Sequence, residues 1–131
     1  MIYLRMKLNA VGVSSKDLTK TVIFYKLLGF SFPEFNDDEV HLESITKEGS
    51  AKLMIDAEKL MTDLIGEIPK PANHSNFAIE YETPEEVNDI AKKVKESGFK
   101  IVKEPWDAFW GQRYCVLEDP DSYKIDLYSI L

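Results

Sequence analysis

Two periodic patterns follow one another near the start of the chain. Apolar or small residues alternate with others over residues 8–15, LNAVGVSS, which is typical of a β-strand. Residues 17–29, DLTKTVIFYKLLG, then space their apolar residues with the period of a helix. Asp17 is a favourable N-cap and Gly29 a favourable stop, so the pattern predicts a helix between them.

Strand-like segments continue after this helix. They are predicted at residues 30–35, 39–47 and 51–57, with a turn at residues 47–50. Residues 58–74 contain two prolines and show no clear strand period, so we interpret them as a connector.

The same order of elements then recurs. A strand is predicted at residues 75–82, followed by a helix with the N-cap Thr83, Pro84 at its first position and Gly98 as its stop. Three more strands are predicted, at residues 99–105, 113–119 and 123–129. The closing strands also match, because KLMI at 52–55 corresponds to KIDL at 124–127. The sequence therefore predicts an α+β fold built from two βαβββ modules.

The length of 131 residues fits one domain, residues 1–131. We place module one at about 6–57, the connector at about 58–74 and module two at about 75–131. Hydrophobic residues make up 44% of the chain and charged residues 30%, as in an ordinary globular protein.

The net charge and the cysteine content limit the expected classes of partner and the expected cellular compartment. The net charge of −7 disfavours nucleic acid and anionic lipid. The sequence has no apolar run near the roughly 20 residues that a transmembrane helix needs, so no membrane partner is expected. The single Cys115 excludes an internal disulfide and favours the cytoplasm.

Strand alternation predicts two unlike faces in each sheet. One face is continuously apolar and should pack on the helices: Val11, Val13, Leu53, Ile55, Phe77, Ile79, Ile125 and Leu127. The opposite face is small and mixed: Ala10, Gly12, Ser14, Lys52, Met54, Asp56, Asn76, Ala78, Glu80, Lys124, Asp126 and Tyr128. This second face either encloses a cavity or faces water, and the pattern leaves both interpretations open.

Several motifs together resemble a known superfamily. DLTKTVIFYKLLGF, the run from NFAIEYETPEE to VKEPWD, FWGQRY and EDPDSYKIDL are similar to vicinal oxygen chelate proteins over nearly the whole chain. That superfamily includes glyoxalase I, extradiol dioxygenases, fosfomycin-modifying enzymes and bleomycin-resistance proteins. The resemblance implies paired βαβββ modules whose mixed sheet curls around a cleft, helices on the outer face, and a homodimer. The glycine usual in the DPDG turn is replaced by Ser122, which implies strain if this position has a positive φ.

The resemblance also implies where metal ligands would stand: Ala10, Met54, Asn76 and Asp126. A divalent ion needs about three ligands of His or carboxylate type, and only Asp126 qualifies. A shift of two residues would add Asp56 as a second carboxylate. We therefore expect no metal and no cofactor.

Catalytic groups are not evident either. His41 shares a strand face with Glu43 and is interpreted as part of a surface ladder. His74 lies in the connector, and Cys115 is interpreted as a small core residue.

Binding of a small molecule is the leading hypothesis. Trp106, Phe109 and Trp110 offer flat apolar walls that attract planar rings or cations, and Asp126 adds a negative charge. The full predicted set is Trp106, Phe109, Trp110, Met54, Asn76, Asp126, Tyr128 and Arg113. Alternatively, the tryptophans cover a sheet edge or a dimer seam, and Arg113 pins a loop through Glu118, Asp119 or Asp121.

Three functions are carried forward. The first is metal-free binding of an aromatic or cationic ligand, as in antibiotic sequestration. The second is a glyoxalase-like lyase, isomerase or dioxygenase with an atypical metal site. The third is a non-catalytic dimeric scaffold.

Overall fold

The computed structural model describes residues 6–72 and 77–131. Its elements follow in the order β1 (Ala10–Ser15), α1 (Leu18–Leu27), β2 (His41–Glu43), β3 (Lys52–Ala57), α2 (Glu58–Ile65), β4 (Phe77–Glu80), α3 (Pro84–Glu96), β5 (Lys100–Ala108), β6 (Gln112–Glu118) and β7 (Lys124–Ile130).

Local sequence signals define the two long helices. The side chain of Asp17 accepts a hydrogen bond from the backbone N–H of Lys20, and Thr83 does the same for Glu86. Each cap satisfies one of the N–H groups that a helix start leaves unpaired. The predicted helices α1 and α3 are thereby confirmed, including Pro84 at the start of α3.

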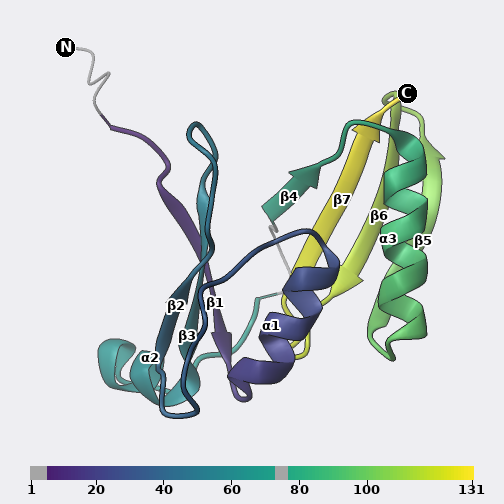
Figure 1. Cartoon of the computed structure of the whole chain (residues 1–131). Coiled ribbons are helices and arrows are strands. Elements are labelled where there is room, and N and C mark those ends of the chain that lie inside the picture. Colours follow the sequence, from purple (N-terminus) through teal and green to yellow (C-terminus); the bar gives the residue numbers. More distant parts are fainter. Residues whose placement is uncertain (1–5, 73–76) are drawn as a thin grey trace.

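The strands form two sheets with related topology. The strand orders are β1-β3-β2 and β4-β7-β6-β5. In each sheet the first strand of the module pairs in parallel with the last, and the remaining pairs are antiparallel. Figure 1 shows the sheets side by side, with α3 covering one face of the second sheet and α1 lying between the two. The predicted α+β class with two related modules is confirmed.

One strand prediction in the first half is wrong. Residues 30–35 form no regular strand; among the described backbone contacts, Ile45 donates to the carbonyl of Ser31 at 2.7 Å. Pro33 explains this, because proline has no N–H to donate to a sheet. The connector also contains a helix, α2, which ends at Gly66 with φ 83°.

The core joins both halves of the chain. The predicted apolar face is confirmed, because Leu53, Ile55, Ile125 and Leu127 are all fully buried in one cluster with residues of α1 and α3. The ring of Phe24 on α1 meets Phe99 edge-on at 5.2 Å between centroids. Hydrophobic burial therefore holds the two sheets together across their seam.

The turn before β7 is fastened to α1. The hydroxyl of Tyr25 donates to the Asp119 carboxylate at 2.7 Å, and the backbone N–H of Lys16 donates to Asp121 at 3.0 Å. Burial raises the pKa of Asp119 to about 6, although hydrogen bonds from Tyr25 and two backbone N–H groups oppose the rise. Ser122 has φ 73°, the positive value anticipated from the missing glycine.

Candidate functional site

The two sheets have comparable open faces, by which we mean the faces whose side chains alternate with the buried core residues. On the first sheet Gly12 lies beside Met54, and on the second Ala78 lies beside Asp126. Both pairs join the first and last strands of a module. Met54 and Asp126 therefore occupy equivalent places, as the matching closing strands predicted.

The positions implied for a metal do not supply enough ligands. The register places Gly12 rather than Ala10 beside Met54, and Asn76 lies outside the described residues, as His74 does. Within the described part of the chain, Asp126 is the one carboxylate at these places. No group of three or more His, Cys, Asp or Glu side chains in that part is arranged to hold a metal ion. These donors do not fit a divalent metal centre.

Aromatic rings cluster on the open face of the second sheet and at its β5–β6 turn. The ring cluster consists of Trp106, Phe109, Trp110, Tyr114 and Tyr128. Trp110 meets Tyr114 at 5.4 Å and Trp106 at 6.1 Å between centroids, both nearly edge-on. Tyr114 stacks on Tyr128 at 6.1 Å. The rings touch one another, so a guest would lie upon the cluster rather than between its rings.

Exposure increases toward the β5–β6 turn. Trp106, Tyr114 and Tyr128 are half-buried, whereas Trp110 is 49% exposed and Phe109 is 97% exposed. The Trp110 indole N–H donates to Gln112 at 2.9 Å, which orients its ring. The predicted residues Trp106, Phe109, Trp110 and Tyr128 are therefore brought together, with the outer rings accessible to solvent.

Asp126 lies at the edge of this cluster. Its carboxylate accepts a hydrogen bond from the Tyr114 hydroxyl. Burial, and then this bond to Asp126, raise the pKa of Tyr114, so its phenol remains a protonated donor at neutral pH. The cluster is thus an aromatic surface with one carboxylate held in place by a ring hydroxyl.

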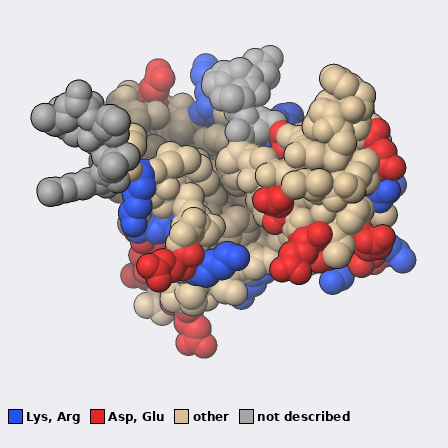
Figure 2. Space-filling model, turned by 90° about the horizontal axis from the view of Figure 1, so that it is seen from above, with Lys and Arg blue, Asp and Glu red and all other residues tan. Residues whose placement is uncertain are grey.

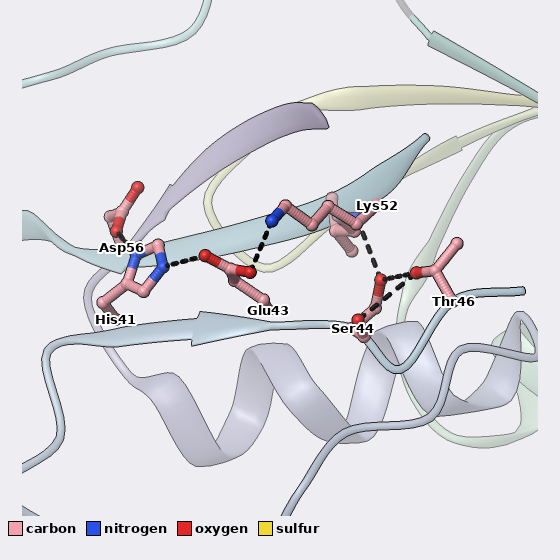
Figure 3. A network of polar contacts seen from close by, with 7 residues as sticks. His41, Glu43, Ser44, Thr46, Lys52 and Asp56 are labelled. Carbon is pink, nitrogen blue, oxygen red and sulfur yellow. Dashed lines mark hydrogen bonds and ion pairs between the residues drawn. The ribbon is translucent and has the colours of Figure 1, made fainter. Parts of the chain in front are cut away.

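The open face of the first sheet is charged instead. His41 contacts Asp56 through Nδ1 and Glu43 through Nε2, and Lys52 pairs with Glu43 at 2.7 Å, as Figure 3 shows. The predicted His41–Glu43 contact is confirmed. Hydrogen bonds to Glu43 and Asp56 raise the pKa of His41. Both ring nitrogens face carboxylates, which favours the protonated ring, and His41 is part of a charged ladder.

Met54 and Arg113 are separated from the ring cluster. Met54 belongs to the first sheet and lies against Gly12. Arg113 alternates with the open-face residues of β6, pairs with Asp107 and donates to Asn88 of α3 at 3.0 Å. Among the described contacts, its partners are therefore Asp107 and Asn88 rather than the predicted acids of the β6–β7 turn.

A cavity of about 760 Å³ lies at the seam between the sheets. Its walls are mostly apolar and include Val11, Phe30, Phe77 and Ile79. None of the predicted ligand-binding residues that the structure describes lines this cavity. The ring cluster is therefore an open surface separate from this hollow.

Two residues near the cluster escaped the sequence prediction. The hydrogen bond from Tyr114 to Asp126 depends on the β6–β7 register, which the sequence does not reveal. Lys103 lies over the Trp106 ring, with Nζ 4.0 Å from its centroid. The motif FWGQRY, with its three aromatic residues, was the available signal for Tyr114, whereas the sequence carried no comparable signal for Lys103.

Acidic and basic side chains are mixed on the surface of the molecule (Figure 2). Figure 2 shows acidic and basic side chains interspersed, without a continuous basic area on the described part of that face. Within the described ranges, every helix is too short or too polar to cross a membrane.

Comparison with known proteins identifies a family. Residues 7–127 match the model of the glyoxalase/bleomycin resistance protein/dioxygenase superfamily. A comparison with curated proteins found no match.

Solved structures share the fold. Hypothetical protein SA1046 from S. aureus is 22% identical, with a TM-score of 0.78 over 95% of this chain and 94% of that one. A family enzyme from Burkholderia phytofirmans PsJN is 18% identical, with a TM-score of 0.79 over 96% and 100%. Lactoylglutathione lyase from Agrobacterium tumefaciens is 13% identical, with a TM-score of 0.66 over 94% and 92%. At these identities the likeness establishes the fold alone.

Proposed function

Because the chain belongs to the glyoxalase/bleomycin resistance protein/dioxygenase superfamily, we propose that it binds a planar or cationic small molecule without a metal ion. The ring cluster is the observation that carries this proposal. It presents aromatic faces beside the Asp126 carboxylate, and such faces attract rings and cations. Sequestration of an antibiotic is the role that this binding would serve.

The shortage of metal ligands supports the same proposal. Lyase and dioxygenase chemistry in this superfamily would use a metal as a Lewis acid, and the described residues at the implied positions do not fit one. Equilibrium dialysis against Ni²⁺ and Zn²⁺, followed by elemental analysis, is expected to leave well under one ion per chain. Retention of about one ion per chain would contradict metal-free binding.

Ligand binding is tested by calorimetric titration with N-methylquinolinium, a planar cation. Replacing Trp110 by Ala removes an exposed ring and is expected to weaken binding about tenfold. The matched control is Ile65→Ala, which removes an exposed apolar side chain from α2, at the other end of the molecule in Figure 1. Equal affinities for both variants would refute the role of the ring cluster.

Dimerisation is part of the proposal. Phe109, Ile130 and Leu131 are 97%, 62% and 57% exposed, and Leu131 N–H donates to the carbonyl of Gly111 at 3.0 Å. This bond gathers exposed apolar side chains at one end of the second sheet, where a second copy would cover them. Light scattering after size exclusion is expected to give twice the chain mass for the unaltered protein. The Phe109→Ser variant should have a smaller average mass, because it removes an exposed apolar ring from the proposed interface. The proposed location is the cytoplasm, because the single cysteine, Cys115, can form no internal disulfide.

A second candidate function, an enzyme, is favoured by one observation. His41 and Asp56 form a paired imidazole and carboxylate on an open face, as a general base and its orienting group would. The competing contact of His41 with Glu43 places this candidate second. Loss of a measured turnover in His41→Asn, with N-methylquinolinium binding unchanged, would favour the enzyme.

A further inference from the structure

The ring cluster already holds a cation of its own. The ammonium of Lys103 lies 4.0 Å from the centroid of the Trp106 ring. A cation over an indole face is attracted by the negative charge of the ring face. The contact matters because the same aromatic face would receive a cationic guest.

An irregular strand produces this contact. Lys103 and Trp106 are three residues apart, so a regular strand would point them to opposite faces. The pairing of β5 with β6 shifts twice, between Ile101 and Lys103 and between Lys103 and Trp106. Lys103 consequently stands opposite Val116, and Trp106 opposite Tyr114.

The second shift brings both side chains to the open face. Val116 and Tyr114 are two residues apart on β6 and therefore share a face, so their partners on β5 share it too. Pro105 lies between Lys103 and Trp106, and proline favours such a break because it cannot donate to the ladder. β-Bulges commonly re-aim side chains beside binding sites.

We propose that Lys103 is a tethered occupant of the Trp106 face, which a compact organic cation displaces when it binds. This inference rests on the proposed function and specifies its ligand class. Asp126 lies in the same cross-strand row as Lys103 and Val116, so a guest that replaces the ammonium meets a carboxylate two strands away.

Displacement is feasible because the tether is weak. Lys103 is exposed, and an exposed cation–π contact lowers the affinity of a competing guest by only about two- to fivefold. Neighbouring lysines are held by carboxylates instead: Lys95 pairs with Glu104 at 2.9 Å and Lys100 with Glu118 at 3.7 Å. Lys103 thus differs from them in using a ring as its partner.

The test compares two variants that remove one charge each from β5. Lys103→Met frees the indole face, whereas Lys100→Met leaves the Lys103 contact intact and corrects for the change in net charge. N-Methylquinolinium and the anion quinoline-2-carboxylate, which share a ring system, are titrated into both variants and the unaltered protein. We expect Lys103→Met to bind the cation about two- to fivefold more tightly than Lys100→Met. The anion should show no such gain.

The contrary outcomes are distinct. If the unaltered protein binds the cation and both variants match, the ring cluster binds ligand but Lys103 does not occupy it. If Lys103→Met instead loses the anion while its cation affinity is unchanged, Lys103 recruits anions and the inference is wrong. If no protein binds either probe, the proposed function fails as well.

A measurement on the ligand-free protein tests separately whether Lys103 occupies the Trp106 face. The indole N–H resonance of Trp106 should move in Lys103→Met and stay in place in Lys100→Met. An unmoved resonance in Lys103→Met would overturn the occupancy of this face.

Discussion

The open faces of the two sheets differ far more than the backbones that carry them. Both present the same pairing of first and last strands, with Gly12 beside Met54 and Ala78 beside Asp126. One face nevertheless bears the His41 ladder and the other bears the ring cluster. The helix-facing sides stay alike, because both must bury apolar residues. The fold therefore constrains one side of each sheet and leaves the other free to diverge.

The largest effect is expected where the two halves are alike. Leu53 and Ile125 are equivalent, fully buried residues of β3 and β7. Replacing either by Ala should lower the free energy of unfolding by about 2–5 kcal/mol, because each leaves a cavity. Urea unfolding measures the loss, with Met54→Ala as the open-face control. A small loss in one half only would show that its core is not equivalent.

Removing a polar interaction from each open face should destabilise the protein to different extents. Tyr114→Phe loses the bond to Asp126 in a half-buried setting and should cost about 1 kcal/mol of stability. Glu43→Gln disrupts solvent-exposed ion pairs with His41 and Lys52 and should lower the urea midpoint less than Tyr114→Phe does. Urea midpoints of the two variants give the comparison. The reverse order would mean that the charged ladder, rather than the aromatic face, is the rigid one.

The turn between β6 and β7 should be stabilised by a glycine, as the corresponding turn between β2 and β3 already has one. Gly49, in the turn between β2 and β3, has φ 89°, whereas Ser122 in the turn between β6 and β7 has φ 73°. Ser122→Gly should raise the free energy of unfolding by about 1 kcal/mol, because glycine adopts this conformation without steric cost. Thermal unfolding would reveal it, with Ser50→Gly as the control. An unchanged melting temperature would mean that the serine is not strained.

The smallest effect should be a pH dependence confined to the first sheet. The pKa of His41 is raised in the folded protein, so its contribution to stability is complete below its unfolded pKa of about 6.5. This contribution is lost as the pH rises through the higher folded value. The urea midpoint of the unaltered protein should therefore fall across that range, relative to His41→Asn. Parallel curves for the two proteins would show that the ladder does not stabilise the cation.

Local signals in the sequence predicted much of the fold. The caps Asp17 and Thr83 act within a few residues, so each helix start was visible without tertiary information. The alternation that buries Leu53 and Ile125 was equally local. Residues 30–35 have the apolar alternation of a strand but do not form one, because Pro33 has no N–H to donate to a neighbouring strand.

The candidate site was harder to predict because it depends on register. The pairing of His41 with Asp56 requires β2 to lie against β3 in one alignment. Lys103 reaches Trp106 only because the register of β5 shifts between them, and single-residue shifts of this kind leave little trace in composition. Trp106, Trp110 and Tyr128 were assembled as predicted, whereas Arg113 faces α3 and its partners were not foreseen.

The anchoring of α1 to the last turn has a consequence for exchange between relatives. Tyr25 and Lys16 of the first half bind Asp119 and Asp121 of the second, so neither half carries a complete fastening. A chimera that joins this first half to a relative's second half would keep the donors Tyr25 and Lys16 without necessarily keeping the carboxylates that accept from them. The start of α1 and the turn before β7 should therefore be exchanged together between relatives, although they lie in different modules.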